Sequence, residues 1–113
     1  MLKSKIKTSS PEFKRNKEHH QELVKKLREF EAQVELGGGQ EARKRHEERG
    51  KLFVRERVQG LLDPGTVFLE LSKLAAHGLY DDEAPGAGLM TGIGIVHGRE
   101  VMVVANDATI KGG

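Results

Sequence analysis

The residues best suited to chemistry lie at the end of the sequence, where VMVVANDATIKGG runs from an apolar stretch into a polar turn and two glycines. Lys111 offers a cation, while Gly112 and Gly113 offer backbone N–H groups that a ligand can approach closely because glycine has no side chain. This combination suits a negatively charged ligand. The alternative is a plain turn after a buried strand, in which Asn106 and Asp107 bond the local backbone and Lys111 is solvated.

Other patterns that could bind a cofactor or metal fail on spacing. LGGGQ follows no strand and precedes no Lys-Ser or Lys-Thr pair, so it predicts the end of a helix rather than a phosphate loop. GIGIVHG lacks the spacing of a dinucleotide-binding pattern, and Gly92 and Gly94 instead predict close packing of another element on a strand. The five histidines show no metal-ligand spacing with cysteines or paired carboxylates. We therefore predict no metal site.

Composition predicts a chain with a thin core. The 113 residues are 36% hydrophobic and 32% charged, without Cys or Trp, so no disulfide can compensate for a small core. No apolar run approaches the roughly 20 residues that a membrane span needs. The basic start, MLKSKIKTSSPEF, has no apolar segment behind it. These features predict a cytoplasmic chain that does not interact with membranes.

The charge is divided between the two halves of the sequence. Residues 1–57 hold 16 Lys and Arg against 10 Asp and Glu, whereas residues 58–113 hold 3 against 7. A basic half followed by an acidic half indicates a nucleic-acid arm or a surface for an acidic partner. The basic residues alternate with Glu, as in KKLREFEAQVE, and few aromatic residues are present for stacking. We therefore expect no nucleic-acid partner.

The first half predicts helices. Ser10 can cap a first helix whose first position is Pro11. The segment from Glu12 to Leu36 is free of Gly and Pro and rich in helix formers. Its apolar residues recur at steps of four, three and four and form one stripe that needs a partner: Leu23, Leu27, Phe30 and Val34. A second short helix is expected in EARKRHEERG and a third in VRERVQGLLDPG, where Asp63-Pro64-Gly65 forces a turn.

The second half predicts strands. TVFLELS is a short β-prone run, and residues 89–96 and 100–105 form a hairpin around a tight turn at His97-Gly98. VMVVA is apolar on both faces, which is typical of a strand covered from both sides. We therefore expect the opening section of a larger α/β domain with a further layer.

Ordered blocks over about Leu36 to Gly113, roughly two thirds of the chain, carry a family resemblance. They are LGGGQEARKRHEERGKLFVRERVQGLLDPGTVFLELS, then Leu79-Tyr80, then PGAGLMTGIGIVHGREVMVVANDATIKGG. The series resembles the amino-terminal part of the carboxyltransferase (beta) subunit of biotin-dependent acyl-CoA carboxylases. It is most similar to the methylcrotonyl-CoA carboxylase branch, whose pattern includes LGGG, LLDPG, FLELS, TGIG and ANDATVKGG.

The resemblance implies an α/β fold with two regions. Residues 1–62 would form a helical amino-terminal arm, and residues 63–113 would form the opening β-hairpin of a crotonase-like (ClpP/crotonase) domain, incomplete here. The complete subunit would transfer the carboxyl group from carboxybiotin to an acyl-CoA, with 3-methylcrotonyl-CoA giving 3-methylglutaconyl-CoA. Lys111, Gly112 and Gly113 then become candidates for binding acyl-CoA near its pantetheine or phosphates. The family's main catalytic segments would lie beyond this sequence, so the chain alone is expected to be inactive.

The resemblance also implies partners and cofactors. Biotin would be carried by an alpha subunit that uses ATP and bicarbonate, and this chain alone would bind no cofactor. Other beta subunits and the acyl-CoA substrate would be the remaining partners. Two alternatives stay open: a carboxyltransferase for another acyl-CoA, such as geranyl-CoA or propionyl-CoA, and a non-catalytic interaction module that docks on a full-length carboxylase subunit through its helical stripe.

Overall fold

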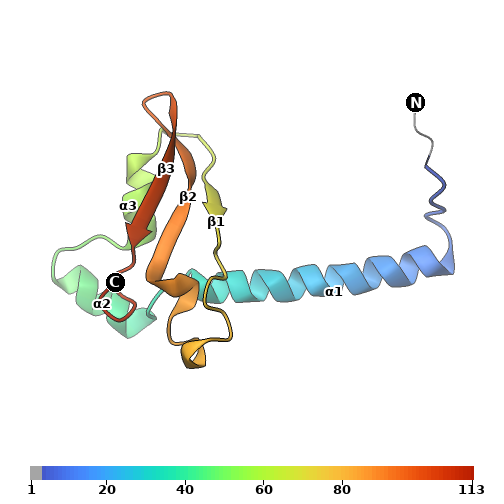
Figure 1. Cartoon of the computed structure of the whole chain (residues 1–113), viewed down its shortest axis with the longest axis horizontal. Helices are drawn as coiled ribbons and strands as arrows, with labels where there is room; N and C mark the ends of the chain where they lie inside the picture. Colours follow the sequence, from blue (N-terminus) through green and yellow to red (C-terminus); the bar gives the residue numbers. More distant parts are fainter. Residues whose placement is uncertain (1–3) are drawn as a thin grey trace. The chain divides into compact units, whose positions relative to one another are not determined.

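The computed structural model describes residues 4–113. Three α-helices precede a three-stranded antiparallel sheet, and two short 3-10 helices lie between its first two strands (Figure 1). The described residues form two compact units, one that ends at Phe30 and one from Glu31 to Gly113. The helices and the hairpin are the elements that the sequence predicts.

The first helix, α1 (Pro11–Val34), forms largely from local preferences. Its start is as predicted, because Ser10 Oγ accepts a hydrogen bond from the Phe13 N–H at 3.2 Å, and Pro11 occupies the first position, where no N–H partner is needed. None of its residues is buried. Helix-forming side chains and capping, rather than burial, therefore account for this helix.

Two short helices follow in the second unit. The helix α2 (Gln40–Glu48) ends before Gly50, whose φ of +72° is a left-handed conformation that glycine adopts without strain. The helix α3 (Val54–Leu61) starts after an extended Phe53, whose N–H donates to Glu56 Oε2 at 3.2 Å. This bond satisfies one of the N–H groups that a helix start leaves open.

The sheet has the order β1-β2-β3, with strands Leu69–Leu71, Leu89–Val96 and Arg99–Asn106. The hairpin of β2 and β3 turns at His97 and Gly98, as predicted, and both have positive φ, as the favoured two-residue hairpin turn requires. The strand β1 is shorter than the predicted β-prone run TVFLELS. Between β1 and β2 the chain forms two 3-10 helices, η1 (Tyr80–Asp82) and η2 (Pro85–Gly88).

Asp63 holds the turn of the hairpin. Its two carboxylate oxygens accept hydrogen bonds from the N–H groups of His97 and Gly98, each at 2.7 Å, and its own N–H donates to the Ile95 carbonyl at 2.8 Å. The N–H groups of Gly98 and His97 hold the pKa of this carboxyl below its usual value. The Asp-Pro-Gly segment therefore ends α3 and also closes the hairpin 34 residues away.

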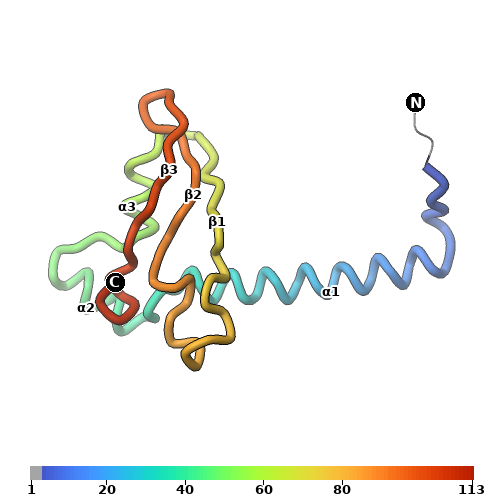
Figure 2. Tube along the Cα trace, viewed as in Figure 1, coloured from blue at the N-terminus to red at the C-terminus, as the bar shows by residue number. Residues whose placement is uncertain are grey.

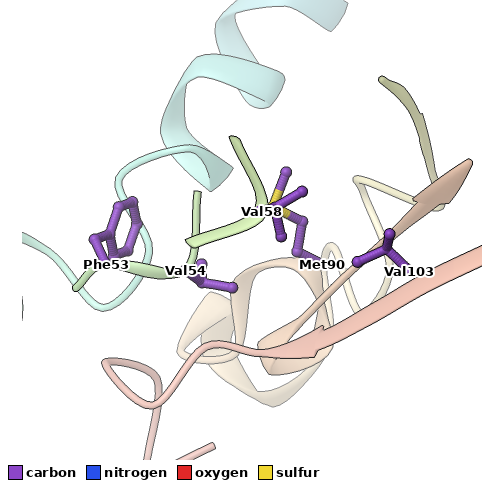
Figure 3. Packing of buried hydrophobic residues seen from close by; sticks show 5 residues of the cluster. All are labelled: Phe53, Val54, Val58, Met90 and Val103. Atoms are coloured by element: carbon purple, nitrogen blue, oxygen red, sulfur yellow. The ribbon is translucent and has the colours of Figure 1, made fainter. Parts of the chain in front are cut away.

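The core lies between α3 and one face of the sheet. Figure 3 shows Val58 of α3 against Met90 of β2, with Val103 on the neighbouring strand β3. Leu62 and Phe68 pack around this cluster. The full set of buried residues in the cluster is Phe53, Val54, Val58, Met90 and Val103.

Gly92 and Gly94 make room for these neighbouring side chains. A Cβ on Gly92 would lie 2.3 Å from the Phe68 ring, and a Cβ on Gly94 would lie 2.3 Å from a methyl group of Leu62. The prediction that these glycines allow another element to pack closely on the strand is confirmed. Their role is steric, because neither has a positive φ.

The other face of the sheet is open within residues 4–113. Leu69, Ile93 and Met102 are cross-strand neighbours on this face, and Leu69 and Met102 are 58% and 60% exposed. Val104, in the next row, is 65% exposed. Within the described residues, α3 and its neighbours cover only the face that carries Met90 and Val103, and the other face is the one for which the apolar strand predicts a further layer.

An ion-pair network joins β1 to its neighbours in the second unit. Arg55 of α3 donates two hydrogen bonds to the two Glu70 carboxylate oxygens, each at 2.9 Å. Lys73 bonds Glu35 at 2.9 Å and lies 3.6 Å from Glu70. The side-chain exposures of Arg55 and Glu70 are 25% and 14%, so this bidentate pair is partly shielded from water and fixes α3 against the sheet edge.

Candidate functional site

The loop that follows β3 is built around a buried carboxylate. Asp107 and Thr109 are only 5% and 8% exposed. Asp107 Oδ1 accepts hydrogen bonds from the Thr109 N–H at 2.9 Å and from the Thr109 hydroxyl at 2.5 Å, and the Asp107 N–H donates to the Gly88 carbonyl at 2.9 Å. These bonds give residues 107–113 a fixed conformation at the end of β3.

The LGGG turn after α1 contacts this loop directly. The Gly38 N–H donates to Thr109 Oγ1 at 3.0 Å, across 71 residues of sequence. A Cβ on Gly38 would lie 1.9 Å from the Thr109 carbonyl oxygen, so no residue with a side chain fits there without displacing the backbone. The sequence predicts LGGG only as a helix end. Its second role, as a close contact of the ANDATIKGG loop, is visible only in the structure.

The loop and α2 together form a pocket of about 310 Å³. Figure 2 shows the trace of the C-terminal loop beside α2. The helix contributes Ala42, Arg45 and His46 together with its C-cap residue Arg49, and the loop contributes Ala108, Thr109, Lys111 and Gly112. The lining therefore includes two guanidinium groups, an ammonium group and an imidazole, and no carboxylate. Such a lining suits an anionic ligand.

Two of these cations have no partner within the described part of the chain. Arg45 and Arg49 form no ion pair or side-chain hydrogen bond among residues 4–113. His46 differs, since its Nε2 lies 3.1 Å from the Leu52 carbonyl oxygen. The two arginines are therefore available to a ligand, and the imidazole is already engaged in holding the segment after α2.

Lys111 is paired with an acidic residue of the preceding loop. Its Nζ donates a hydrogen bond to Glu83 Oε2, and this bond lowers the pKa of the Glu83 carboxyl below its usual value. Both side chains are more than half exposed, at 61% and 63%. An exposed pair of this kind contributes little to stability, so a stronger anion can displace Glu83 from Lys111.

The backbone around Lys111 also offers donors. Lys111 and Gly112 have φ values of +48° and +90°, so two consecutive residues lie in the left-handed region. Within the described residues, neither N–H has a hydrogen-bond acceptor. Backbone N–H groups that lie next to each other in a turn form a concave site for anions.

The predicted site residues are brought together only in part. Lys111 and Gly112 line the pocket, whereas Gly113 does not and instead donates its N–H to the Ile110 carbonyl at 2.8 Å. Asp107 bonds the local backbone, as the alternative of a plain turn expects, but Lys111 is paired rather than merely solvated. Sequence reasoning missed Arg45 and Arg49, although their spacing of four residues within the basic block RKRHEER was a usable signal.

No group of three or more His, Asp or Glu side chains among residues 4–113 could hold a metal ion. No helix in this described range has the length and apolar character that crossing a membrane requires.

Comparison with known proteins identifies the family. Residues 45–113 match the model of the carboxyl transferase domain. The chain is similar to the biotin-dependent 3-methylcrotonyl-coenzyme A carboxylase beta1 subunit of Mycobacterium tuberculosis, with 59% identity over 85% of this chain and 18% of that protein. It is also similar to the probable mitochondrial methylcrotonoyl-CoA carboxylase beta chain of Drosophila melanogaster, with 52% identity over 100% of this chain and 20% of that protein.

A solved structure supports the fold assignment. The geranyl-CoA carboxylase beta subunit of P. aeruginosa superposes with a TM-score of 0.85 and 40% identity, over 99% of this chain and 21% of that one. The chain thus spans about a fifth of the length of these relatives. The predicted helical segment followed by the opening hairpin of a crotonase-like domain is confirmed, and the chain belongs to the carboxyl transferase domain family.

Proposed function

We propose that this chain supplies the amino-terminal part of a carboxyltransferase subunit that moves a carboxyl group from carboxybiotin to an acyl-CoA. The observation that carries the proposal is the correspondence with the geranyl-CoA carboxylase beta subunit over 99% of the chain. Helices, hairpin and C-terminal loop all fall within that correspondence. Because the chain spans about a fifth of such subunits, we propose that it has no carboxylase activity alone.

The proposed substrate is 3-methylcrotonyl-CoA, which carboxylation converts to 3-methylglutaconyl-CoA. The names of the M. tuberculosis and Drosophila relatives, at 59% and 52% identity, support this choice. Geranyl-CoA is the second candidate, because the structural relative at 40% identity is a geranyl-CoA carboxylase subunit. Propionyl-CoA is the remaining alternative from the sequence.

Lys111, Gly112 and Gly113 are the proposed contacts to acyl-CoA. The support is strongest for Lys111 and Gly112, which line the basic pocket, and weaker for Gly113, which does not. We also propose residues 1–62 as a helical arm and residues 63–113 as the start of the crotonase-like domain. On this division, α3 is the part of the arm that packs into the core of that domain through Val54 and Val58.

The proposed partners are a biotin-carrying alpha subunit, which would use ATP and bicarbonate, and further beta subunits. The M. tuberculosis relative is named as biotin-dependent, which supports biotin use by the assembly. The pocket described above, lined by arginines, a lysine and polar backbone, does not suit the uncharged ring system of biotin. We therefore assign no step through biotin to this chain. A cytoplasmic location also remains a prediction.

A chimera tests the proposed function. This chain would replace the matched amino-terminal segment of the M. tuberculosis beta1 subunit, and the chimera would be co-expressed with the biotin-carrying partner. We expect incorporation of labelled bicarbonate into 3-methylcrotonyl-CoA well above that of a control lacking the amino-terminal segment, with geranyl-CoA and propionyl-CoA compared in parallel. A chimera that assembles to the size of the parent enzyme but carboxylates none of the three would refute the proposal.

The interaction-module alternative has one structural observation in its favour. Leu23 and Leu27 of the predicted stripe are 47% and 44% exposed. Co-expression of the 113-residue chain with an intact beta subunit decides between an interaction module and a segment of a carboxyltransferase. A stable complex that is lost on Leu23→Lys and Leu27→Lys, together with an inactive chimera, would favour the module.

A further inference from the structure

We propose that α1 pairs with the same helix of a second copy of this chain, side by side and in the same direction, as a short parallel coiled coil. The inference rests on one part of the proposed function, the further beta subunits given as partners, and it names the segment through which two copies would meet. It does not depend on the reaction or on the acyl-CoA. The helix is continuous over 24 residues, which is long enough for about three heptads (Figure 1).

The apolar side of α1 has the spacing of a coiled-coil seam. With Phe13 taken as an a position, the a and d positions recur at alternating steps of three and four residues, which is the period of a left-handed coiled coil. Leu23, Leu27 and Phe30 follow one another in this series, and each is more than a third exposed. The seven positions, called the α1 seam below, are Phe13, Asn16, His20, Leu23, Leu27, Phe30 and Val34.

The rest of the helix surface is suited to water. Apart from Pro11 and Ala32, every apolar residue of α1 lies on the α1 seam or, in the case of Val24, directly beside it. On the opposite side Lys25 and Glu29 form a surface ion pair at 3.9 Å, with side chains 78% and 58% exposed. An apolar strip this narrow matches a single partner helix better than it matches the broader contact of a helix packed on a core.

Charge complementarity favours a second copy in parallel orientation. In a parallel pair, each g residue lies next to the e residue five positions further along the partner helix. Glu12 then meets Lys17 of the second copy, and Lys26 meets Glu31 of the second copy. Each of these attractive contacts forms twice by symmetry, and no contact between like charges forms. An antiparallel pair that sets Leu23 against Leu27 would instead bring the two Lys26 side chains together.

The charges that flank the α1 seam are available for these contacts. Glu12, Lys17 and Lys26 are exposed and form no ion pair or side-chain hydrogen bond with another residue in the range 4–113. Glu31 is partly buried and interacts electrostatically with Lys73. Three of the four charged positions are therefore open to a partner, and the fourth needs a control for its effect within the chain.

Two polar residues determine how strong the pair is. Asn16 and His20 lie at d and a positions, where a polar side chain lowers the stability of a coiled coil and helps to fix its register. A coiled coil of about three heptads is also short. We therefore expect a concentration-dependent dimer rather than a permanent one.

The experiment is sedimentation equilibrium of the 113-residue chain over a range of concentrations at low salt. Wild type is compared with Lys26→Glu, with Glu31→Lys and with an equimolar mixture of these two variants. Lys25→Glu is the matched control, because it makes the same charge change one residue away on the exposed side of the helix. Val104→Lys tests the open face of the sheet as an alternative surface. Circular dichroism verifies that each variant keeps its helix content.

We expect wild type to show a monomer–dimer equilibrium. Each single variant, Lys26→Glu or Glu31→Lys, should weaken the dimer about tenfold, because two attractive contacts become two repulsive ones. The mixture should dimerise about as well as wild type, since its unlike chains again place opposite charges together. This recovery can come only from contacts between copies, because the mixture contains the same two chains. Lys25→Glu and Val104→Lys should each change the dimerisation constant less than about twofold.

A cross-link measures the orientation of the two helices. The chain has no cysteine, so Leu23→Cys introduces the only thiol. In a parallel pair the two position-23 side chains face each other across the α1 seam, where a disulfide can join them, whereas the antiparallel pair separates them. In a glutathione buffer we expect a covalent dimer for Leu23→Cys and much less for Gln21→Cys, whose side chain lies away from the α1 seam.

Contrary results are distinct from failure of the proposed function. A folded chain that stays monomeric at every concentration overturns the helix pair. So does a dimer that neither charge variant weakens, a dimer that Val104→Lys abolishes, or equal cross-linking of Leu23→Cys and Gln21→Cys. An active chimera beside a monomeric chain would reject only the helix pair. An inactive chimera beside confirmed pairing would contradict the proposed reaction and leave the helix pair in place.

Discussion

Replacing Gly38 by alanine should destabilise the second unit more than an ordinary glycine-to-alanine change. Gly38 does not have a positive φ, so an alanine is not strained by its backbone conformation. The cost comes from space, because the added Cβ would lie 1.9 Å from the carbonyl oxygen and 2.6 Å from the carbonyl carbon of Thr109. Both atoms belong to backbone and cannot rotate away, so the loop must move.

The expected magnitude is the sum of two effects. Overpacking of this kind costs about 1–3 kcal/mol. Displacement of the loop also lengthens the 3.0 Å hydrogen bond from the Gly38 N–H to Thr109 Oγ1, worth about 1 kcal/mol. We therefore expect a loss of about 2–4 kcal/mol in the free energy of unfolding.

Gly60→Ala is the matched control. Gly60 lies in α3, is exposed, has no positive φ, and an added Cβ there would meet nothing within 4 Å. Alanine should therefore raise stability by about 0.5–1 kcal/mol through helix propensity. Urea unfolding followed by circular dichroism measures both changes, with Gly38→Ala also made in the Gly60→Ala background. If the free energy of unfolding of the Gly38→Ala chain is within about 0.5 kcal/mol of that of its parent, the contact with Thr109 does not exist in solution.

Two further predictions test the hairpin and the core. Because the pKa of Asp63 is lowered in the folded state, its bonds to His97 and Gly98 stabilise the fold above the unfolded-state pKa, and this contribution disappears as pH falls through the folded-state pKa. Asp63→Asn should therefore weaken the dependence of the unfolding free energy on acid pH. Unfolding curves with the same pH dependence as wild type would contradict this role of Asp63. Met90→Ala should lower the free energy of unfolding by about 2–5 kcal/mol because Met90 is 7% exposed, whereas Met102→Ala, at a 60% exposed position, should lower it far less. Equal losses in urea unfolding would contradict the assigned faces of the sheet.

The sequence was most informative where local rules decide the structure. The start of α1 follows from Ser10 and Pro11, and the hairpin turn follows from His97-Gly98 between apolar runs. Gly92 and Gly94 were correctly interpreted as sites of close packing. Each of these features depends on residues that are adjacent or two apart, so sequence spacing carries the information.

Features that depend on distant residues could not be predicted in the same way. The contact of Gly38 with Thr109 joins segments 71 residues apart, and no spacing rule indicates it. The pocket needs α2 and the C-terminal loop to meet, so the spacing of Arg45 and Arg49 indicates a shared helix face but not the pocket that this face lines. The apolar strand predicts a further layer on β3, and the exposed Met102 and Val104 show the face that such a layer would cover, but the sequence pattern alone does not show which face α3 covers.

The two glycine-rich segments serve different physical purposes at one place in the fold. Gly38 is needed for space against Thr109, whereas Gly112, with φ +90° and nothing within 4 Å of an added Cβ, is needed for its backbone conformation and its exposed N–H. Displacement at Gly38 shifts the loop that carries Lys111 and therefore affects both stability and the pocket. A change at Gly112 alters only the loop backbone at the pocket wall. Stability and ligand binding are thus coupled through Thr109, the residue that contacts the LGGG turn and also lines the basic pocket.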